Sequence, residues 1–213
     1  MTYRLAVLAD VHADVAALDD ALKRIERLGC NEVVCAGDVV GYGDAPDETI
    51  ARLHTAAVAT VRGNHDRWLV ERVTRGESTA ASEGLRDPRS LAFLQELRPI
   101  LGFSRLGVRI VVCHGSPRSD IQQVLADEVD LSWCRSLLEK ADADVLVVGH
   151  SHLPAMIHVG GTGLIVNPGA LLRSSDVVSA PGTFGVLELP SRRFTVFEAA
   201  SGREVAVRTR YLR

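Results

Sequence analysis

The chain has 213 residues, of which 46% are hydrophobic and 24% charged, a composition typical of a globular protein that can bury its own core. The formal net charge of -3 argues against a dedicated nucleic-acid surface, because such surfaces usually carry excess positive charge. The sequence contains neither a run of 18 apolar residues nor a signal-peptide pattern, so we expect a cytoplasmic protein that does not enter a membrane.

Short apolar runs rich in valine and isoleucine recur along the chain, and each is followed by Gly, Asp, Asn or His. Their length and composition predict buried strands. The predicted strands are residues 4–9, 32–36, 57–61, 109–113, 144–148 and 163–166.

Helical patterns separate these strands. Asp14 is a suitable cap for a helix with an apolar stripe over 15–28, and Gly29 is a suitable stop. Pro46 begins a second helix that runs to about residue 56. Three further helices are predicted at 66–75, 88–97 and 131–141, and the small, polar stretch 74–86 is predicted to be a loop.

After Asn167 the chain changes to closely spaced segments of alternating polarity, at 183–190, 193–200 and 204–212, which predict antiparallel hairpins. A chain that is α/β first and β-rich last fits an α/β (α+β) fold, in which two mixed sheets form a four-layer β-sandwich flanked by helices. The length suits one compact domain, so we take residues 1–213 as a single domain.

Potential metal ligands follow five of the predicted strands, at the point where each strand ends. Five of the 7 histidines lie at these positions. Because the carboxyl ends of neighbouring strands in an α/β sheet lie along one edge, these side chains are expected to converge. The segments are Asp10-Val11-His12, Gly37-Asp38, Gly63-Asn64-His65-Asp66, His114-Gly115 and Gly149-His150-Ser151-His152.

Each of these segments also has an ordinary structural interpretation. Asp10 is a common loop or cap residue, Gly63-Asn64 suits a left-handed turn, and a lone His114 is more often a hydrogen-bonded core histidine. Gly37-Asp38 is an ordinary turn sequence. All of these interpretations would have to hold at five successive strand ends, so the set as a whole favours a ligand site.

Imidazole and carboxylate ligands without thiolate suit first-row divalent metals, among which we favour Mn²⁺ over Fe, Zn, Co and Ni. The candidate ligands are too many for one tetrahedral site, but they suffice for two ions if one carboxylate bridges. They are Asp10, His12, Asp38, Asn64, His114, His150 and His152.

The ordered set Asp-x-His, Gly-Asp, Gly-Asn-His-Asp, His-Gly and Gly-His-Ser-His resembles the calcineurin-like metallophosphoesterase superfamily, whose fold is a β-sandwich flanked by helices. The resemblance implies that Asp38 bridges two ions and that a hydroxide between them attacks phosphorus. It also implies that His65 is a general acid for the leaving group, and that Asn64 and His65 contact the substrate. The implied ligands are Asp10, His12 and His152 for one ion, and Asn64, His114 and His150 for the other.

The second motif departs from the pattern of the protein phosphatases. Gly37-Asp38 continues as VVGYG, without the arginine that would clamp a phosphomonoester. The chain is similar instead to the small, uncapped phosphodiesterase branch of bacteria and archaea. Asn167-Pro168-Gly169-Ala170 also resembles that branch, and we assign these residues no chemical role.

Three functions remain open at this point. The first is a dinuclear, metal-dependent phosphodiesterase acting on small phosphodiesters or nucleotides. The second is a phosphomonoesterase or dinucleoside-polyphosphate hydrolase of the same fold, and the third is a non-catalytic metal-binding scaffold for protein interaction. We expect a small-molecule substrate and no membrane partner, and the sequence does not fix an oligomeric state.

Two further predictions concern residues outside the ligand set. Asp66 either orients His65 or caps the following helix. Three arginines, Arg67, Arg118 and Arg173, are candidates for phosphate contacts, although each is more often a surface residue.

Overall fold

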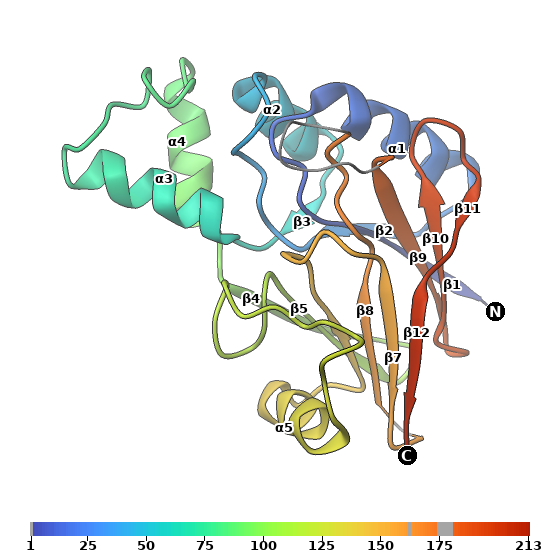
Figure 1. The fold of residues 1–213 in the computed structure, drawn as a ribbon. Helices are drawn as coiled ribbons and strands as arrows, with labels where there is room; N and C mark the ends of the chain where they lie inside the picture. The colour runs from blue at the N-terminus through green and yellow to red at the C-terminus, as the bar shows by residue number, and fades with distance from the viewer. Residues whose placement is uncertain (1, 162, 174–180) are drawn as a thin grey trace.

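The computed structural model describes residues 2–161, 163–173 and 181–213, and its strands form two six-stranded sheets that face each other (Figure 1). The first sheet has the order β11 (Glu204–Val205), β10 (Arg193–Glu198), β9 (Thr183–Leu189), β1 (Tyr3–Leu8), β2 (Glu32–Cys35) and β3 (Ala59–Thr60). The second has the order β12 (Arg208–Leu212), β7 (Ala155–Val159), β8 (Gly163–Asn167), β6 (Val145–Val147), β5 (Val108–Cys113) and β4 (Ile100–Arg105).

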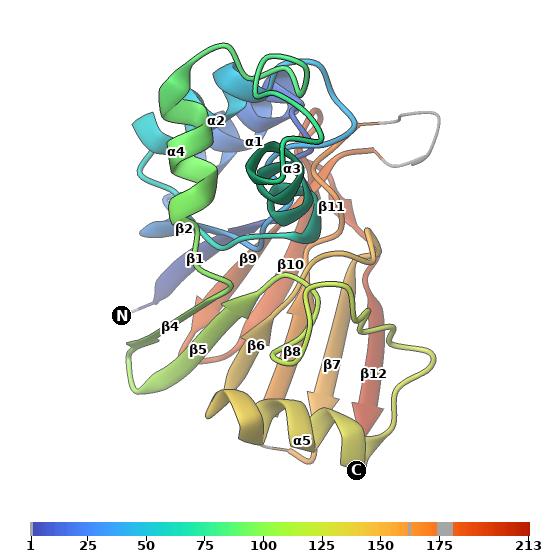
Figure 2. The ribbon, with the colours of Figure 1, turned by 90° about the vertical axis from the view of Figure 1, so that its left-hand side faces the viewer.

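The alternation of side chains along each strand separates the apolar residues into layers. In β1, Leu5 and Val7 pack between the two sheets, whereas Ala6 and Leu8 pack against α1 (Val15–Arg27) and α2 (Pro46–Thr55). On the far side, α5 (Leu131–Ala141) covers the outer face of the second sheet (Figure 2). These four layers confirm the predicted flanked sandwich. No helix among the described residues is long and apolar enough to cross a bilayer.

The order of the parallel strands determines where the functional loops meet. In the first sheet β1, β2 and β3 are parallel, and in the second β5, β6 and β8 are parallel. The two parallel groups therefore each send their carboxyl-terminal loops to one end of the strands. Helices α3 (Asn64–Thr74) and α4 (Pro88–Glu96) follow the first group and project to one side of the sandwich (Figure 1).

The structure adds two strands that were not predicted and corrects one predicted pairing. Strands β4 and β7 were not expected, because half-buried strands lack the continuous apolar run of a buried one. Of the segment 204–212, only β11 forms the expected antiparallel pair, with β10. The chain then crosses to the other sheet, where β12 pairs in parallel with β7. The ladder is formed by backbone groups, so the alternating pattern of this segment predicts strands without indicating which strand each one pairs with.

Helix α3 begins two residues before the expected position, which places Asn64 and His65 in its first turn. Asp66 causes the early start, because its Oδ2 accepts the backbone N–H of Gly63 at 2.8 Å. Its Oδ1 accepts the N–H groups of Val39 and Val40 at 2.9 and 3.1 Å. Asp66 therefore caps α3 and ties it to the loop after β2, rather than orienting the ring of His65.

Asn167 holds the loop between β6 and β7, a role that the sequence did not reveal. Its Nδ2 donates to the carbonyl of Gly149 at 2.8 Å and to Ser151 Oγ at 3.1 Å. Its Oδ1 accepts the N–H of Gly169 at 2.8 Å. This buried amide thus links the end of β8 to the segment that contains His150.

The substitution Asn167→Asp should lower the free energy of unfolding by about 3 kcal/mol, because a buried carboxylate cannot donate to the Gly149 carbonyl. Urea denaturation followed by circular dichroism measures the change. Asn31→Asp is the matched control, because the Oδ1 of Asn31 only accepts the N–H of Arg4 and an aspartate retains that bond. Equal stability of the two variants would contradict the role given to Asn167.

Candidate metal centre

Side chains from the ends of both parallel groups meet between the two sheets. Asp10 Oδ1 lies 3.3 Å from His152 Nε2, and Asp38 Oδ2 lies 3.1 Å from His114 Nε2. Asn64 Oδ1 lies 2.9 Å from the same nitrogen of His114. Residues that are far apart in the sequence are therefore in direct contact, as the convergence of strand ends predicts.

The seven predicted ligands fall into groups that can each hold an ion. In each group, one ligand atom from every member lies within 4.8 Å of the others. Asn64 joins the second group through its contact with His114. The groups are Asp10, His12 and His152; Asp38, His114 and His150; and His12, Asp38 and His65.

The backbone at these positions adopts a conformation that is uncommon for residues with a side chain. Positive φ angles occur at Asp10 (52°), His12 (48°), Asp38 (52°), His150 (66°) and His152 (59°). Each such residue costs about 1–3 kcal/mol and persists only where its surroundings hold it. Strain of this kind, repeated at five of the predicted ligands, is typical of a functional site.

The hydrogen bonds of His114 show that its Nε2 lacks a protein donor. Its Nδ1 lies 2.7 Å from the carbonyl oxygen of Ala36, which can only accept, so Nδ1 bears the proton in the neutral ring. The Nε2 lone pair then faces the oxygens of Asp38 and Asn64. In the neutral ring these three acceptors repel one another, and either a proton on Nε2 or a divalent metal ion, which fits this donor set, removes the repulsion.

The pKa values of the metal-free site also indicate that positive charge is favoured there. Burial lowers the pKa of His114, but the adjacent Asp38 carboxylate outweighs burial and raises that pKa to about 9. Burial raises the pKa of Asp38, and the interaction with His114 more than reverses this, bringing it to about 2. A proton on His114 therefore occupies the place that a metal ion would take.

The other side of the centre has the same pattern. His12 Nδ1 lies 3.1 Å from the carbonyl of Val40, which directs its Nε2 towards His152 Nε2 at 3.2 Å. Burial lowers the pKa of His12 to about 4, so its ring is neutral and offers a lone pair. His150 Nε2 lies 3.1 Å from the carbonyl of Ile121, which leaves its Nδ1 as the ligand atom.

His65 lies at the border between the centre and the surface. Its backbone N–H donates to Asp38 Oδ1 at 2.8 Å, and its half-buried ring stands edge-on to His12 with centroids 5.0 Å apart. Burial lowers the pKa of His65, and the charge of Asp38 offsets part of that change. Gly41 permits this packing, because a Cβ there would lie 2.6 Å from His12 Nδ1 and 3.0 Å from His65 Nδ1.

The three arginines considered for phosphate contacts are engaged elsewhere. Arg67 binds both carboxylate oxygens of Asp120, at 2.6 and 3.2 Å. Arg173 pairs with Asp14 and Asp20, and Arg118 donates to Ser136 Oγ at 2.8 Å. Their structural role is therefore favoured over contact with substrate.

Comparison with known proteins agrees with this geometry. The sequence matches the model of the calcineurin-like phosphoesterase superfamily domain over residues 3–192. The uncharacterised protein MJ0912 of Methanocaldococcus jannaschii is 26% identical over 198 residues, which cover 82% of this chain and 79% of that protein.

Solved structures share the fold at lower sequence identity. A metallophosphoesterase from Sphaerobacter thermophilus superimposes with a TM-score of 0.72 at 22% identity, over 98% of this chain and 90% of that one. A protein described as a novel archaeal phosphodiesterase superimposes with a TM-score of 0.58 at 15% identity, over 95% and 98% of the two chains. On the match of the family model across nearly its whole length, the chain belongs to the calcineurin-like phosphoesterase superfamily.

Proposed function

We propose that the protein is a dinuclear, metal-dependent phosphodiesterase that hydrolyses small phosphodiesters or nucleotides. The observation that supports it most directly is the convergence of metal-ligating atoms around Asp38 and His114, a donor set that suits a divalent metal ion. The superfamily match supports a phosphoester hydrolase, and the likeness to an archaeal phosphodiesterase agrees with the narrower proposal.

Two Mn²⁺ ions are the proposed cofactors. Asp38 is the shared ligand, since it belongs to a candidate group on either side of the centre. When bound, two such ions supply a nucleophile from water at neutral pH and neutralise charge on the phosphate. The remaining proposed ligands are Asp10, His12 and His152 for one ion, and Asn64, His114 and His150 for the other.

His65 is the proposed general acid. It stands beside the centre but has one edge open to solvent, where a departing oxygen can reach it. Burial favours its neutral form in the free protein. An anionic phosphate next to the ring would raise the pKa of His65. The imidazole would then carry the proton that it donates while the substrate is bound. Asn64, in the same turn of α3, is the second proposed substrate contact.

The engagement of the three candidate arginines within the protein favours a diester over a monoester. A phosphomonoester carries the larger negative charge, and enzymes commonly bind it through arginine pairs. Here Arg67, Arg118 and Arg173 are bound to protein partners. We further propose that residues 1–213 act as one domain in the cytoplasm, on a small-molecule substrate, without a membrane or nucleic-acid partner.

Metal-dependent hydrolysis tests the function as a whole. After chelator treatment and dialysis, Mn²⁺ should raise the melting temperature, because binding only the folded state stabilises it. The reloaded protein should hydrolyse bis-p-nitrophenyl phosphate faster than p-nitrophenyl phosphate or diadenosine tetraphosphate. Preference for either of the latter two would favour the alternative hydrolase. Stabilisation by Mn²⁺ without hydrolysis of any of the three would favour the scaffold.

His65→Ala should lower turnover of the diester by roughly 10²-fold or more, because proton donation to the leaving group is lost. Its metal content, measured by plasma mass spectrometry, should stay near two ions per chain. His54→Ala is the control, since His54 is exposed on α2. Normal turnover in the His65 variant would remove this residue from the mechanism.

Asp38→Asn should weaken both metal positions together, since the shared ligand loses its charge. The amide keeps an oxygen to accept the N–H of His65, so the fold should survive. Isothermal titration with Mn²⁺ measures the stoichiometry, and Asp127→Asn, at an exposed aspartate, is the control. Loss of only one ion would show that Asp38 does not bridge.

A further inference from the structure

A cleft of about 330 Å³ opens beside His65, on the side away from the metal centre. Its size is at the lower end of the range of small-molecule sites. The loop after β2 and the start of α2 form one wall, and α3 forms the other. The residues that matter here are Tyr42, Pro46, His65, Trp68 and Leu69.

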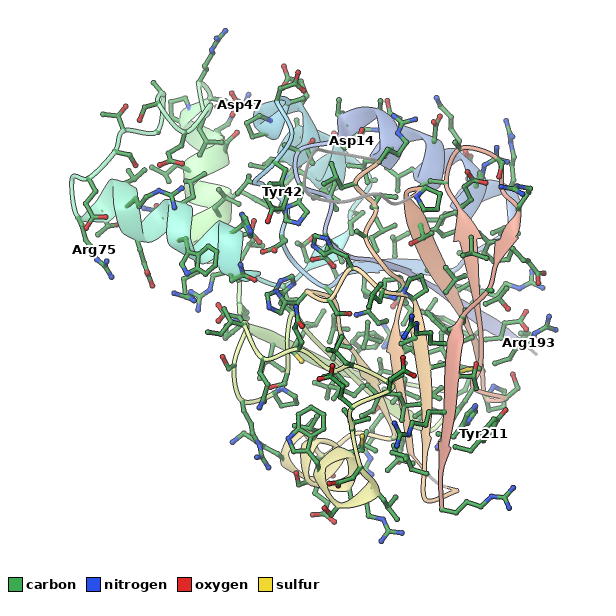
Figure 3. The ribbon with its side chains drawn as sticks, viewed as in Figure 1. Asp14, Tyr42, Asp47, Arg75, Arg193 and Tyr211 are labelled. Carbon is green, nitrogen blue, oxygen red and sulfur yellow. The ribbon has the colours of Figure 1, made fainter. Side chains whose placement is uncertain are left out.

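Two large aromatic side chains stand exposed in this cleft. Tyr42 is 44% exposed and Trp68 is 38% exposed, although both carry large apolar surfaces. Their ring centroids lie 4.9 and 5.2 Å from that of His65, so the imidazole is flanked by both. Figure 3 shows Tyr42 on its loop, in the region between α2 and α3.

The rings are held in place before any ligand binds. Tyr42 packs on His12 with centroids 4.6 Å apart. The guanidinium of Arg67, fixed by Asp120, lies 5.9 Å from the centroid of Trp68. A preorganised site of this kind loses little conformational freedom when a ligand enters.

Two charged side chains in the lining of the cleft, Arg72 and Glu83, pair with each other. Arg72 donates to both oxygens of Glu83, at 2.8 and 2.6 Å. Apart from His65, the cleft therefore offers aromatic and aliphatic surface rather than a free charge. Its occupant should be planar and uncharged.

We propose that this cleft is the leaving-group subsite and that it binds the base of a nucleoside, which Tyr42 and Trp68 contact through their rings. The inference rests on the proposed function, because it takes His65 as the proton donor. Since His65 stands between the metal centre and the cleft, the oxygen that it protonates belongs to the group in the cleft. The enzyme would thus act on nucleoside 5′-phosphodiesters and release the nucleoside.

The reaction conserves atoms without a further reactant. Water supplies hydroxide to phosphorus as the bond from phosphorus to the 5′-oxygen breaks. The 5′-oxygen takes a proton from His65, which regains one from the water that was consumed. A diester of adenosine and methanol would therefore yield adenosine and methyl phosphate.

A matched pair of substrates tests the subsite. Adenosine 5′-(methyl phosphate) and ribose 5-(methyl phosphate) have the same scissile bond and differ in the base. The ratio of their kcat/KM values should be about tenfold in favour of adenosine, because stacking of a base on an aromatic ring contributes about that factor. Adenosine and methyl phosphate should be the products, identified by mass spectrometry.

Tyr42→Leu and Trp68→Leu should each reduce that ratio several-fold, and the ratio cancels any general effect on the metal centre. The matched controls are Tyr211→Leu and Trp133→Leu, which should keep the wild-type ratio. Tyr211 lies on β12 near the C-terminus, far from Tyr42 (Figure 3), and Trp133 lies on α5. An equal rate for both substrates, or release of methanol and AMP, would overturn the subsite while leaving the phosphodiesterase intact.

A binding measurement separates failure of the subsite from failure of the enzyme. In Trp133→Phe, Trp68 is the only tryptophan of the chain, so its fluorescence reports on the cleft. Adenosine should quench it saturably, and ribose should not. Quenching without hydrolysis of either ester would support the subsite and reject the proposed hydrolase. Hydrolysis without quenching would reject the subsite alone.

Discussion

The site depends on one arrangement: several buried electron-pair donors are held in contact, and positive charge has to lie among them, either as a proton or as a metal ion. His114 Nε2 meets Asp38 and Asn64, and His12 Nε2 meets His152, each with the opposite ring nitrogen of His114 and His12 facing a backbone carbonyl. Such an arrangement is repulsive until positive charge enters it. Burial strengthens that demand, because Asp10, His12, Asp38 and His114 are almost completely removed from water.

The fold opposes this repulsion with backbone hydrogen bonds between the loops. The N–H of Asp10 donates to the carbonyl of Gly37 at 3.0 Å, and the N–H of His12 donates to that of Asp38 at 2.9 Å. Asp66 adds three backbone contacts, although burial raises its own pKa to about 7. The two parallel strand groups supply the rigid frame, and backbone groups of the loops donate hydrogen bonds to one another rather than to water. A strained, electrostatically unfavourable site can persist on such a frame.

The sequence predicted the convergence of these side chains better than it predicted the residues around them, for a physical reason. A strand followed by Gly-Asp or Gly-Asn-His is a local pattern, and parallel topology brings such patterns together without further information. The edge strands β4 and β12 and the half-buried strand β7 lack a continuous apolar run, so their side chains gave little signal. The roles of Tyr42, Trp68 and Asn167 depend on which distant segment each one meets. Residues 174–180, which follow Arg173, lie outside the described part of the chain.

A single loop links metal binding to the choice of substrate. The carbonyl of Val40 orients His12, the missing side chain of Gly41 makes room for the rings of His12 and His65, and Tyr42 packs against both rings. The N–H of Val40 is in turn held by Asp66 at the start of α3. Tyr42, the proposed contact for the leaving group, therefore lies in the same loop as Val40, which orients the proposed metal ligand His12. Because the motif that follows Asp38 is where this chain departs from the protein phosphatases, exchange of that loop would alter the leaving-group side of the centre while the ligand set stayed the same.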